Sequence, residues 1–242
     1  MSNVLITGAT SGLGAALAEQ CLARGDRVIA CGRNAQALQD LQERHGQQVD
    51  IRRFDITDRD AVAESLADLP AIDIAIINAG TCEYLDVDRF DAALVERVLA
   101  ANFLGAVYCS EALLPQLRAG SRLVFVDSLA RLLPFTRSQA YGASKAALHY
   151  FARTMEVDLA ARGIRVQSVS PGFIDTPLTR KNRFAMPMII SPEEAAAGIL
   201  RGIDRGRRNI YVPWGFAALL RLLGALPECL QVRLASKMKG PQ

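Results

Sequence analysis

Apolar and polar positions along the chain follow two patterns that alternate from one end to the other. Short apolar runs, such as 4–6 and 72–77, are typical of buried strands. Between them lie longer segments in which apolar residues recur at three- and four-residue spacing, which indicates helices. This alternation predicts a parallel sheet with helices on both faces. The expected strands are 3–6, 27–31, 49–53, 72–77, 122–127, 164–169 and 209–212, and the expected helices are 13–24, 34–45, 58–68, 91–118, 139–162 and 191–205.

The start of the last of these helices has a clear signal. Ser191 can cap it, Pro192 suits its first turn, and Glu194 completes a capping box. The whole pattern predicts the α/β fold class, with a single doubly wound parallel sheet of seven strands. We expect this domain over residues 1–212, followed by an amphipathic C-terminal extension over 213–242.

Length and composition agree with one domain located in the cytoplasm. The chain has 242 residues, and 50% of them are hydrophobic, which suffices for a large core. The first strand begins by Val4 without a charged and then apolar leader, and no apolar run reaches the roughly 18 residues of a spanning helix. The five cysteines show no spacing for a metal or a disulfide, so we expect buried, reduced thiols.

The C-terminal extension is both apolar and basic. Residues 201–242 contain eight basic and two acidic residues, a net charge of +6, whereas the whole chain carries +3. Such a segment could bind the surface of an anionic membrane peripherally. Alternatively, its apolar face packs on the domain or on a second subunit, which is the favoured interpretation. We expect a homo-oligomer and no nucleic-acid partner. The apolar residues concerned are Trp214, Phe216, Leu219, Leu220, Leu222, Leu223 and Leu226.

Three polar residues carry the strongest chemical signal. Tyr141 and Lys145 are four positions apart, which places both side chains on one face of a helix. An ammonium group beside a phenol favours the phenolate and should lower the pKa of Tyr141 from about 10. Ser128 directly follows a predicted strand, and its hydroxyl could hold the same substrate oxygen that Tyr141 protonates. These groups suit hydride transfer to or from a carbonyl carbon, provided that a cofactor supplies the hydride.

The first strand leads directly into a glycine-rich turn that can bind such a cofactor. Gly8 permits a tight turn, Gly12 lets the backbone approach a pyrophosphate, and Gly14 lets the following helix pack close to the strand. The amino terminus of that helix would then direct its unpaired N–H groups toward the phosphates. A glycine pattern in this strand–turn–helix context is far more specific than the pattern alone.

These motifs and four others, in order over roughly residues 1–212, resemble the short-chain dehydrogenase/reductase family. Asn78-Ala79-Gly80 is similar to the family's motif after the fourth strand, and Asn102-Phe103-Leu104-Gly105 to its helix segment with a fourth catalytic residue. Ser128 precedes Tyr141 by thirteen positions, the family's usual interval. Pro171-Gly172 with Thr176 resembles the segment that clamps the nicotinamide amide.

The resemblance implies a Rossmann fold and a reversible carbonyl reduction without a metal. Ser128 would stabilise the substrate oxygen, Tyr141 would protonate it, Lys145 would tune Tyr141 and hold the nicotinamide ribose, and Asn102 would return protons through water. The implied catalytic residues are Asn102, Ser128, Tyr141 and Lys145. The implied cofactor-binding residues are Gly8, Ser11, Gly12, Leu13, Gly14, Arg33, Asp55, Ile56, Asn78, Ala79, Gly80, Tyr141, Lys145, Pro171, Gly172 and Thr176.

The end of the second strand favours NADP(H) over NAD(H). Gly32 stands where an NAD site commonly has an acid, and Arg33 follows with a guanidinium that can bind a 2′-phosphate bidentately. Arg33 could instead only begin a surface loop. Asp55 resembles the family's acid on the adenine side, but it could equally cap the third helix.

The substrate is less well defined by the sequence. The segments 81–87, 129–137 and 175–190 should border an apolar pocket for an aliphatic or aromatic carbonyl or alcohol, although several of these residues could belong to the core instead. Asn102 could be a buried polar residue bonded to backbone, and His149 is expected to be an exposed or interface histidine. The apolar candidates are Leu129, Leu132, Leu133, Pro134, Phe135, Phe184, Met186, Met188, Ile189 and Ile190.

Two other functions stay open at this level. An NADP(H)-binding sensor without turnover would need the same glycine turn, but it would not need the intact Ser128, Tyr141 and Lys145. A related epimerase or dehydratase usually has a different glycine spacing and a longer substrate domain, for which this chain has no room.

Overall fold

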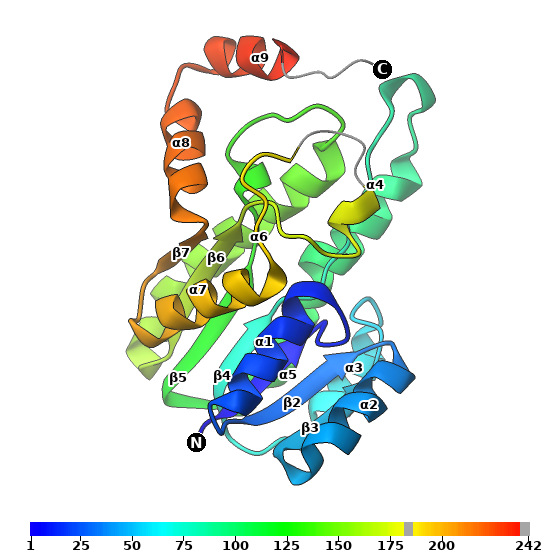
Figure 1. Ribbon diagram of the computed structural model, residues 1–242, viewed down its shortest axis with the longest axis vertical. Helices are drawn as coiled ribbons and strands as arrows, with labels where there is room; N and C mark the ends of the chain where they lie inside the picture. Colours follow the sequence, from blue (N-terminus) through cyan, green and yellow to red (C-terminus); the bar gives the residue numbers. More distant parts are fainter. Residues whose placement is uncertain (182–185, 238–242) are drawn as a thin grey trace.

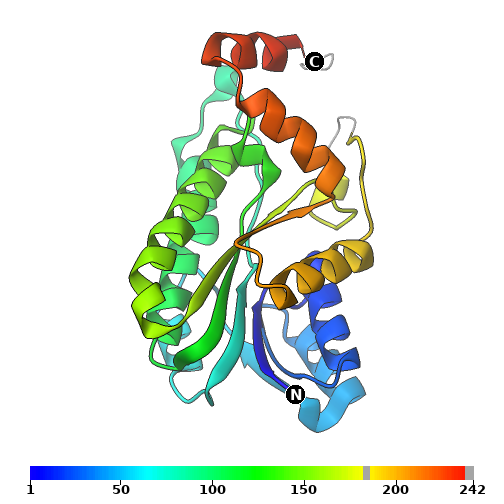
Figure 2. The same ribbon diagram turned by 90° about the vertical axis from the view of Figure 1, so that its left-hand side faces the viewer.

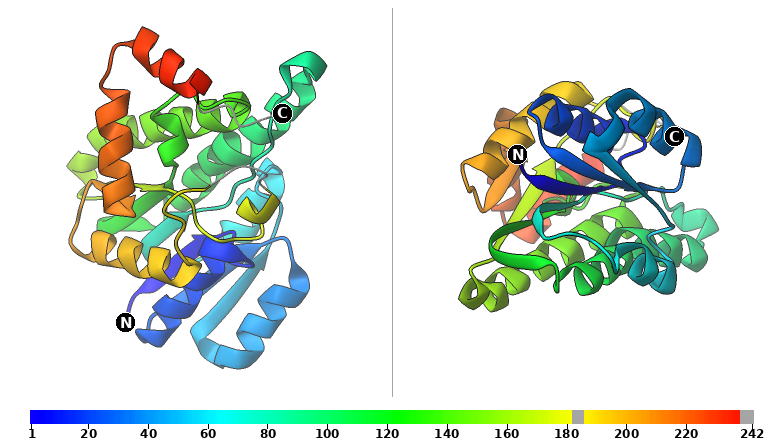
Figure 3. Two further views of the ribbon diagram at one scale, coloured as in Figure 1. Left: turned by 45° about the horizontal axis from the view of Figure 1, so that its top comes forward. Right: turned by 90° about the horizontal axis from the view of Figure 1, so that it is seen from below.

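The fold is a three-layer sandwich with a parallel sheet between two layers of helices (Figures 1 and 3). The computed structural model describes residues 1–181 and 186–237. The sheet has seven strands in the order β3-β2-β1-β4-β5-β6-β7, all parallel. The predicted fold class is therefore confirmed. The strands are β1 (Asn3–Thr7), β2 (Arg27–Gly32), β3 (Val49–Arg53), β4 (Ile72–Ile77), β5 (Leu117–Val126), β6 (Arg165–Pro171) and β7 (Asn209–Val212).

Each face of the sheet has its own apolar core. On one face α1 (Gly12–Ala23), α2 (Ala35–His45) and α7 (Pro192–Asp204) share a buried cluster with alternate strand residues such as Ile6 and Val124. The intervening strand residues, such as Leu5 and Phe125, face a second cluster formed with the helices on the other side. Those helices are α3 (Arg59–Leu66), α4 (Ala92–Leu99), α5 (Gly105–Leu113) and α6 (Gln139–Leu159). As predicted, Ser191 caps α7 by accepting the backbone N–H of Glu194 at 3.0 Å.

The prediction of a continuous helix over 91–118 was wrong at its centre and at its end. A π-helical turn, Ala100–Leu104, separates α4 from α5, and strand β5 already begins at Leu117, not at 122. Leu117 pairs with Ile72 across an irregular register, and Gly120 adopts a φ of +93°, so tertiary pairing overrides the helical pattern here. By length and composition alone, the stretch 92–113 could also span a membrane, but it places Ala106, Cys109 and Leu113 in the second core.

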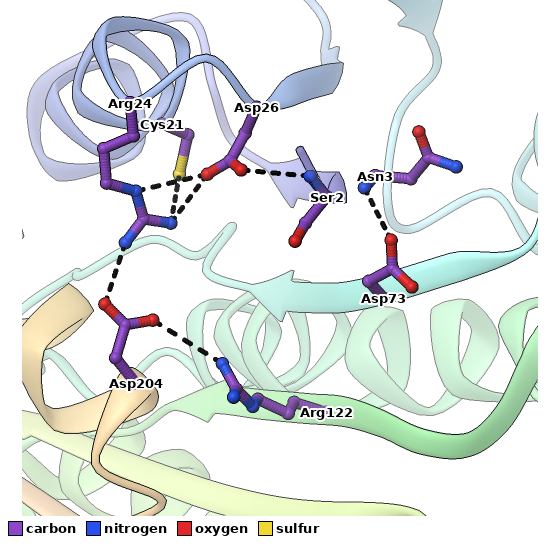
Figure 4. Close-up of polar contacts among 8 residues, drawn as sticks. All are labelled: Ser2, Asn3, Cys21, Arg24, Asp26, Asp73, Arg122 and Asp204. Atoms are coloured by element: carbon purple, nitrogen blue, oxygen red, sulfur yellow. Dashed lines mark hydrogen bonds and ion pairs between the residues drawn. The ribbon is translucent and has the colours of Figure 1, made fainter.

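The amino-terminal edge of the sheet is tied together by a polar network (Figure 4). Arg24 bonds to buried Asp26 at 2.8 Å and to Asp204 of α7 at 3.1 Å, and Asp204 also pairs with Arg122 of β5 at 3.5 Å. Asp26 in turn accepts the N–H of Ser2 at 3.1 Å. These charges compensate one another, so the network joins α1, β2, α7 and β5 at the edge opposite the predicted site.

Two further helices follow β7 at the carboxyl side of the sheet (Figure 2). Helix α8 (Trp214–Gly224) buries Phe216, Ala217 and Leu220 against Leu129 and Leu133, so the packing interpretation is confirmed for this helix. Helix α9 (Glu228–Lys237) has no buried residue. The exposed apolar side chains of the two helices are Trp214, Leu219, Leu222, Leu230, Val232 and Leu234.

All five cysteines are free thiols, but only three of them are buried. The prediction of buried thiols is confirmed for Cys21, Cys31 and Cys109, whereas Cys82 is half-buried and Cys229 is exposed on α9. Cys82 lies in the loop after β4, where it is only partly covered, and Cys229 lies on a helix that has no buried residue. Within residues 1–181 and 186–237, no group of three or more His, Cys, Asp or Glu side chains could hold a metal ion.

Candidate active site

The glycine-rich turn lies at the carboxyl end of β1, next to the point where the strand order reverses between β1 and β4. Gly8 and Gly12 have φ values of +71° and +52°, which non-glycine residues rarely adopt. A Cβ at Gly14 would lie 2.1 Å from the Gly8 carbonyl oxygen, so the turn can close only around glycine. Ser11 precedes α1 without a side-chain cap bond, which leaves N–H groups of the first helical turn available to a ligand. The turn therefore fits a dinucleotide pyrophosphate.

The Asn78-Ala79-Gly80 segment supports this turn from the adjacent strand. The Thr7 hydroxyl accepts the N–H groups of Asn78 at 2.9 Å and Ala79 at 3.0 Å, and the Asn78 amide donates to the Thr7 carbonyl at 3.0 Å. Asn78 thus fixes the shape of the glycine turn. At Gly80 a Cβ would approach Asn102 Oδ1 to 2.8 Å, so this glycine lets the loop pass close to the catalytic candidates.

Arg33 and Asp55 form an ion pair at the carboxyl ends of β2 and β3. Arg33 Nη1 lies 3.2 Å from Asp55 Oδ2, and 77% of the Arg33 side chain is exposed. Burial raises the pKa of Asp55, but bonds from the Thr57 N–H and hydroxyl and from Arg33 outweigh burial, so the net pKa is lowered. Asp55 does not cap α3, because Asp58 accepts the Ala61 N–H there. Arg33 is consequently held beside Gly32 with most of its guanidinium open to solvent.

Two predicted cofactor residues place their side chains in the interior. Leu13 belongs to the first core, and Ile56 is buried against α5. A Cβ at Gly105 would lie only 2.6 Å from Ile56 Cγ1, so this contact is tight. Only the backbone groups of Leu13 and Ile56 are placed to meet a ligand.

The Pro171, Gly172 and Thr176 segment returns toward the glycine turn. Gly172 donates its N–H to Val212 at 2.8 Å, which holds the end of β6 against β7. A Cβ at Gly12 would meet the Thr176 methyl group at 3.0 Å, so Thr176 faces the turn directly. The structure brings these two distant segments together, as a clamp across one bound cofactor requires.

Ser128, Tyr141 and Lys145 converge at the carboxyl end of β5. Ser128 begins the 3₁₀ turn after the strand, and its side chain is hydrogen-bonded to Tyr141. Lys145 is buried, and its Nζ donates to the Val126 carbonyl at 2.8 Å while lying 5.9 Å from the Tyr141 ring centroid. The predicted arrangement of the three side chains is thus present.

The protonation of these groups differs from the expectation. Burial raises the pKa of Tyr141 well above its ordinary value, and the hydrogen bond from Ser128 only partly opposes this effect. The prediction that Tyr141 has a lowered pKa is therefore wrong, because burial desolvates the phenolate and the Lys145 ammonium donates to the Val126 carbonyl. Burial lowers the pKa of Lys145 to about 8, against the charge of Asp127, which raises it.

Asn102 lies in the π-helical turn and is completely buried. Its Oδ1 accepts the Thr81 N–H at 2.7 Å, and its Nδ2 donates to the Thr81 carbonyl and to the Ser144 hydroxyl at 2.9 Å each. Ser144 in turn donates to the Tyr141 carbonyl at 2.7 Å. Such turns are frequent at functional sites, and this one directs Asn102 toward the active-site helix. In the protein without ligand, Asn102 is bonded mainly to backbone.

The three predicted substrate segments contribute unequally. Leu129 and Leu133 are buried against α8 and belong to the core, the alternative considered for them, while Leu132 and Phe135 pack on the same cluster. Met188 and Ile189 are exposed, and a Cβ at Gly215 would contact the Met188 methyl group at 3.6 Å. Phe184 lies outside the described residues.

Two ionisable residues lie behind the site: Asp127, which sequence analysis gave no role, and His149, which it considered and set aside. Asp127, immediately before Ser128, has a side chain with no exposed surface, and His149 Nδ1 lies 2.7 Å from its Oδ2. His149, which we expected to be exposed or at an interface, is instead largely buried and is the partner of this acid. The available signal was the spacing of Tyr141, Lys145 and His149, each four residues after the last on one face of α6.

Fold and site together define a dinucleotide-dependent oxidoreductase. The model of the short chain dehydrogenase family matches residues 2–186, and the chain belongs to this family.

Individual relatives agree with this assignment. The chain is 35% identical to an uncharacterized oxidoreductase of Myxococcus xanthus, over 97% of this chain and 96% of the relative. It is 34% identical to the NADP-dependent 3-hydroxy acid dehydrogenase YdfG of Escherichia coli, over 71% and 72% of the two chains. A crystal structure of a short-chain dehydrogenase from Burkholderia cenocepacia in complex with NADP matches with a TM-score of 0.86 and 29% identity, over 96% of this chain and 97% of that one. The protein is therefore an oxidoreductase, and its relatives include an NADP-dependent dehydrogenase and a short-chain dehydrogenase that binds NADP.

Proposed function

We propose that this enzyme transfers a hydride between NADP(H) and a carbonyl or alcohol substrate, with acid–base catalysis by Ser128, Tyr141 and Lys145. The observation that carries the proposal is the hydrogen-bonded Ser128 and Tyr141 beside buried Lys145 at the end of β5, which only β4 separates from the strand that leads into the glycine turn. Bound NADP(H) supplies or accepts the hydride at the substrate carbon.

The protein groups handle the oxygen and its proton. Ser128 donates a hydrogen bond to the substrate oxygen as it gains negative charge, and Tyr141 gives it a proton. Burial raises the pKa of Tyr141, so the phenol is protonated at neutral pH and holds the proton that carbonyl reduction consumes. Lys145 and Asn102 support the return of a proton to Tyr141; Lys145 lies beside the phenol ring, and the bond to Ser144 holds Asn102 against the same helix.

The substrate that we propose is a neutral, mainly apolar ketone or aldehyde. Met188 and Ile189 of the 175–190 segment are exposed apolar residues, and Arg131 of the 129–137 segment is paired with buried Asp127. The name of the Escherichia coli relative suggests a second class, the 3-hydroxy acids and their 3-oxo counterparts. A charged acid would need a free cation, so we rank it below the uncharged substrates.

Turnover of matched substrates tests the proposal. Purified protein is mixed with NADPH and a panel of ketones and aldehydes, including 3-oxo acids with their methyl esters, and loss of NADPH absorbance is followed. We expect turnover, with esters preferred over the free acids. Tight NADPH binding without turnover of any compound would favour a sensor, and faster turnover of the acids would contradict the apolar substrate class.

The basic helix α9 has a testable prediction of its own. It exposes Leu230, Val232 and Leu234 beside Arg233 and Lys237, and the membrane interpretation applies to this helix more than to packed α8. If it is correct, the protein co-sediments with vesicles containing anionic lipid at low salt, and truncation after Leu226 abolishes this. Truncation after Pro213 is unsuitable because it removes the buried part of α8. Equal sedimentation with purely zwitterionic vesicles, or none at all, would contradict the membrane interpretation.

A further inference from the structure

A buried carboxylate lies directly behind the catalytic candidates. Asp127 follows the last residue of β5 and precedes Ser128, and its side chain has no exposed surface. Its N–H donates to the Val169 carbonyl at 2.8 Å, so the backbone is fixed between β5 and β6. A buried acid without a partner would neutralise itself or destabilise the fold, so its surroundings must account for its charge.

The partners of this carboxylate come from two elements. His149 of α6 lies with Nδ1 2.7 Å from Oδ2, and Arg131 of the following 3₁₀ turn approaches the same oxygen with Nε at 3.5 Å. Arg131 also reaches Ser170 of β6 at 3.4 Å. Among the described residues, no group hydrogen-bonds to Oδ1. The carboxylate is therefore positioned by His149 and faces Arg131 through one oxygen, while its second oxygen accepts no hydrogen bond from the described residues.

Lys145 is the active-site cation on which the charge of Asp127 acts. It lies one turn before His149 on the same face of α6, and its Nζ bonds to the carbonyl of Val126, the residue next to Asp127. Burial alone lowers the pKa of Lys145, while the charge of Asp127 raises it. The other ionisable groups that act on Lys145 and Tyr141 include the Cys82 thiol from the loop after β4, whose pKa burial raises, so it is uncharged at neutral pH.

We propose that Asp127, oriented by His149, is a positioning residue that keeps Lys145 protonated and thereby sets the upper pH limit of activity. The catalytic consequence rests on the proposed function, but the electrostatic link between the two residues does not. Burial lowers the pKa of Lys145 and the negative charge of Asp127 raises it. Without that charge the pKa of Lys145 falls, so Lys145 loses its proton at a lower pH than in the wild type.

The isosteric variant Asp127→Asn tests the link without turnover. The sequence contains four lysines, Lys145, Lys181, Lys237 and Lys239, so the ¹³Cε signals of labelled lysine can be resolved and assigned with Lys145→Met. We expect the titration midpoint of Lys145 to fall by about one pH unit or more in Asp127→Asn, the effect typical of losing a nearby opposite charge. An unchanged midpoint would overturn the proposal.

Activity provides the second arm of the experiment. The alkaline limb of kcat against pH should move down in Asp127→Asn by the same amount as the lysine midpoint, with little change in KM for NADPH. A lysine midpoint that moves while the pH profile stays fixed would overturn the positioning role. Absence of turnover in the wild type would refute the proposed function, whereas the lysine titration would still decide the electrostatic link.

Two controls separate this role from a structural one. Asp26→Asn removes another buried, paired acid at the opposite edge of the sheet. It should alter stability but change neither the titration midpoint of Lys145 nor the alkaline limb of kcat against pH. His149→Phe removes the donor to Asp127, whereas His149→Gln keeps an N–H on a side chain of similar reach. The Phe variant should change the alkaline limb, and the Gln variant should restore it toward the wild-type position. Identical profiles in the two His149 variants would overturn the role of His149.

Discussion

Replacing Tyr141 with Phe is expected to reduce kcat at least about a hundredfold while NADPH binding stays within a few-fold of the wild type. The substitution keeps the ring and its packing and removes only the hydroxyl that donates the proton. Because Tyr141 is hydrogen-bonded to Ser128, the variant also leaves that hydroxyl without its partner in the site. Steady-state turnover of the best ketone and a fluorescence titration with NADPH measure the two effects separately.

Tyr150→Phe is the matched control for this experiment. Tyr150 lies on the same helix, α6, but it is 73% exposed, so loss of its hydroxyl should not affect turnover. A Tyr141→Phe enzyme that retains near-normal turnover would show that another group supplies the proton, and it would refute the assignment of Tyr141.

Replacing Arg33 with Ala is expected to weaken NADPH binding about ten- to a hundredfold and NADH binding much less. A charge-assisted contact to phosphate contributes roughly 1.5–3 kcal/mol, which corresponds to that range of Kd. The loss should be reinforced by Asp55, because its carboxylate pairs with Arg33 and would face the 2′-phosphate uncompensated in the variant. Calorimetric titration of the wild type and of the variant with NADPH and with NADH gives the change in Kd for each cofactor.

Arg44→Ala controls for the loss of an exposed positive charge on the same part of the molecule. Arg44 lies in the last turn of α2 and pairs with Glu19, at the opposite end of the helix from Arg33. It should change neither cofactor affinity appreciably. Equal losses for NADPH and NADH in Arg33→Ala would mean that Arg33 does not read the phosphate.

The hydrophobic pattern was sufficient to predict the sheet, because parallel strands buried on both faces leave a nearly continuous apolar signal. The pattern failed at 100–104 and again at 114–121, where the structure depends on partners distant in sequence. Leu117 is a strand residue because it pairs with Ile72, and the π-helical turn that carries Asn102 is invisible to a helical periodicity.

The candidate site shows the same division between local and tertiary information. The positions of Ser128, Tyr141 and Lys145 follow from spacing on one helix and one strand end, and the structure brings these side chains together. The pKa of Tyr141 depends instead on how deeply the phenol is buried, and the role of His149 on an acid from another element. Neither quantity is encoded in the spacing of residues along the chain.

Helix α8 packs on a small apolar cluster that is separate from the two large cores of the sandwich. Phe216 in that cluster lies against Gly172, and Gly224 lies against the backbone of Leu132, so the helix contacts the segments that follow β5 and β6. The C-terminal part of the chain is thereby joined to the carboxyl side of the sheet without becoming part of either large core. We expect substitutions on the buried face of α8 to shift these two segments and to leave the packing of the sheet and its two helical layers unchanged.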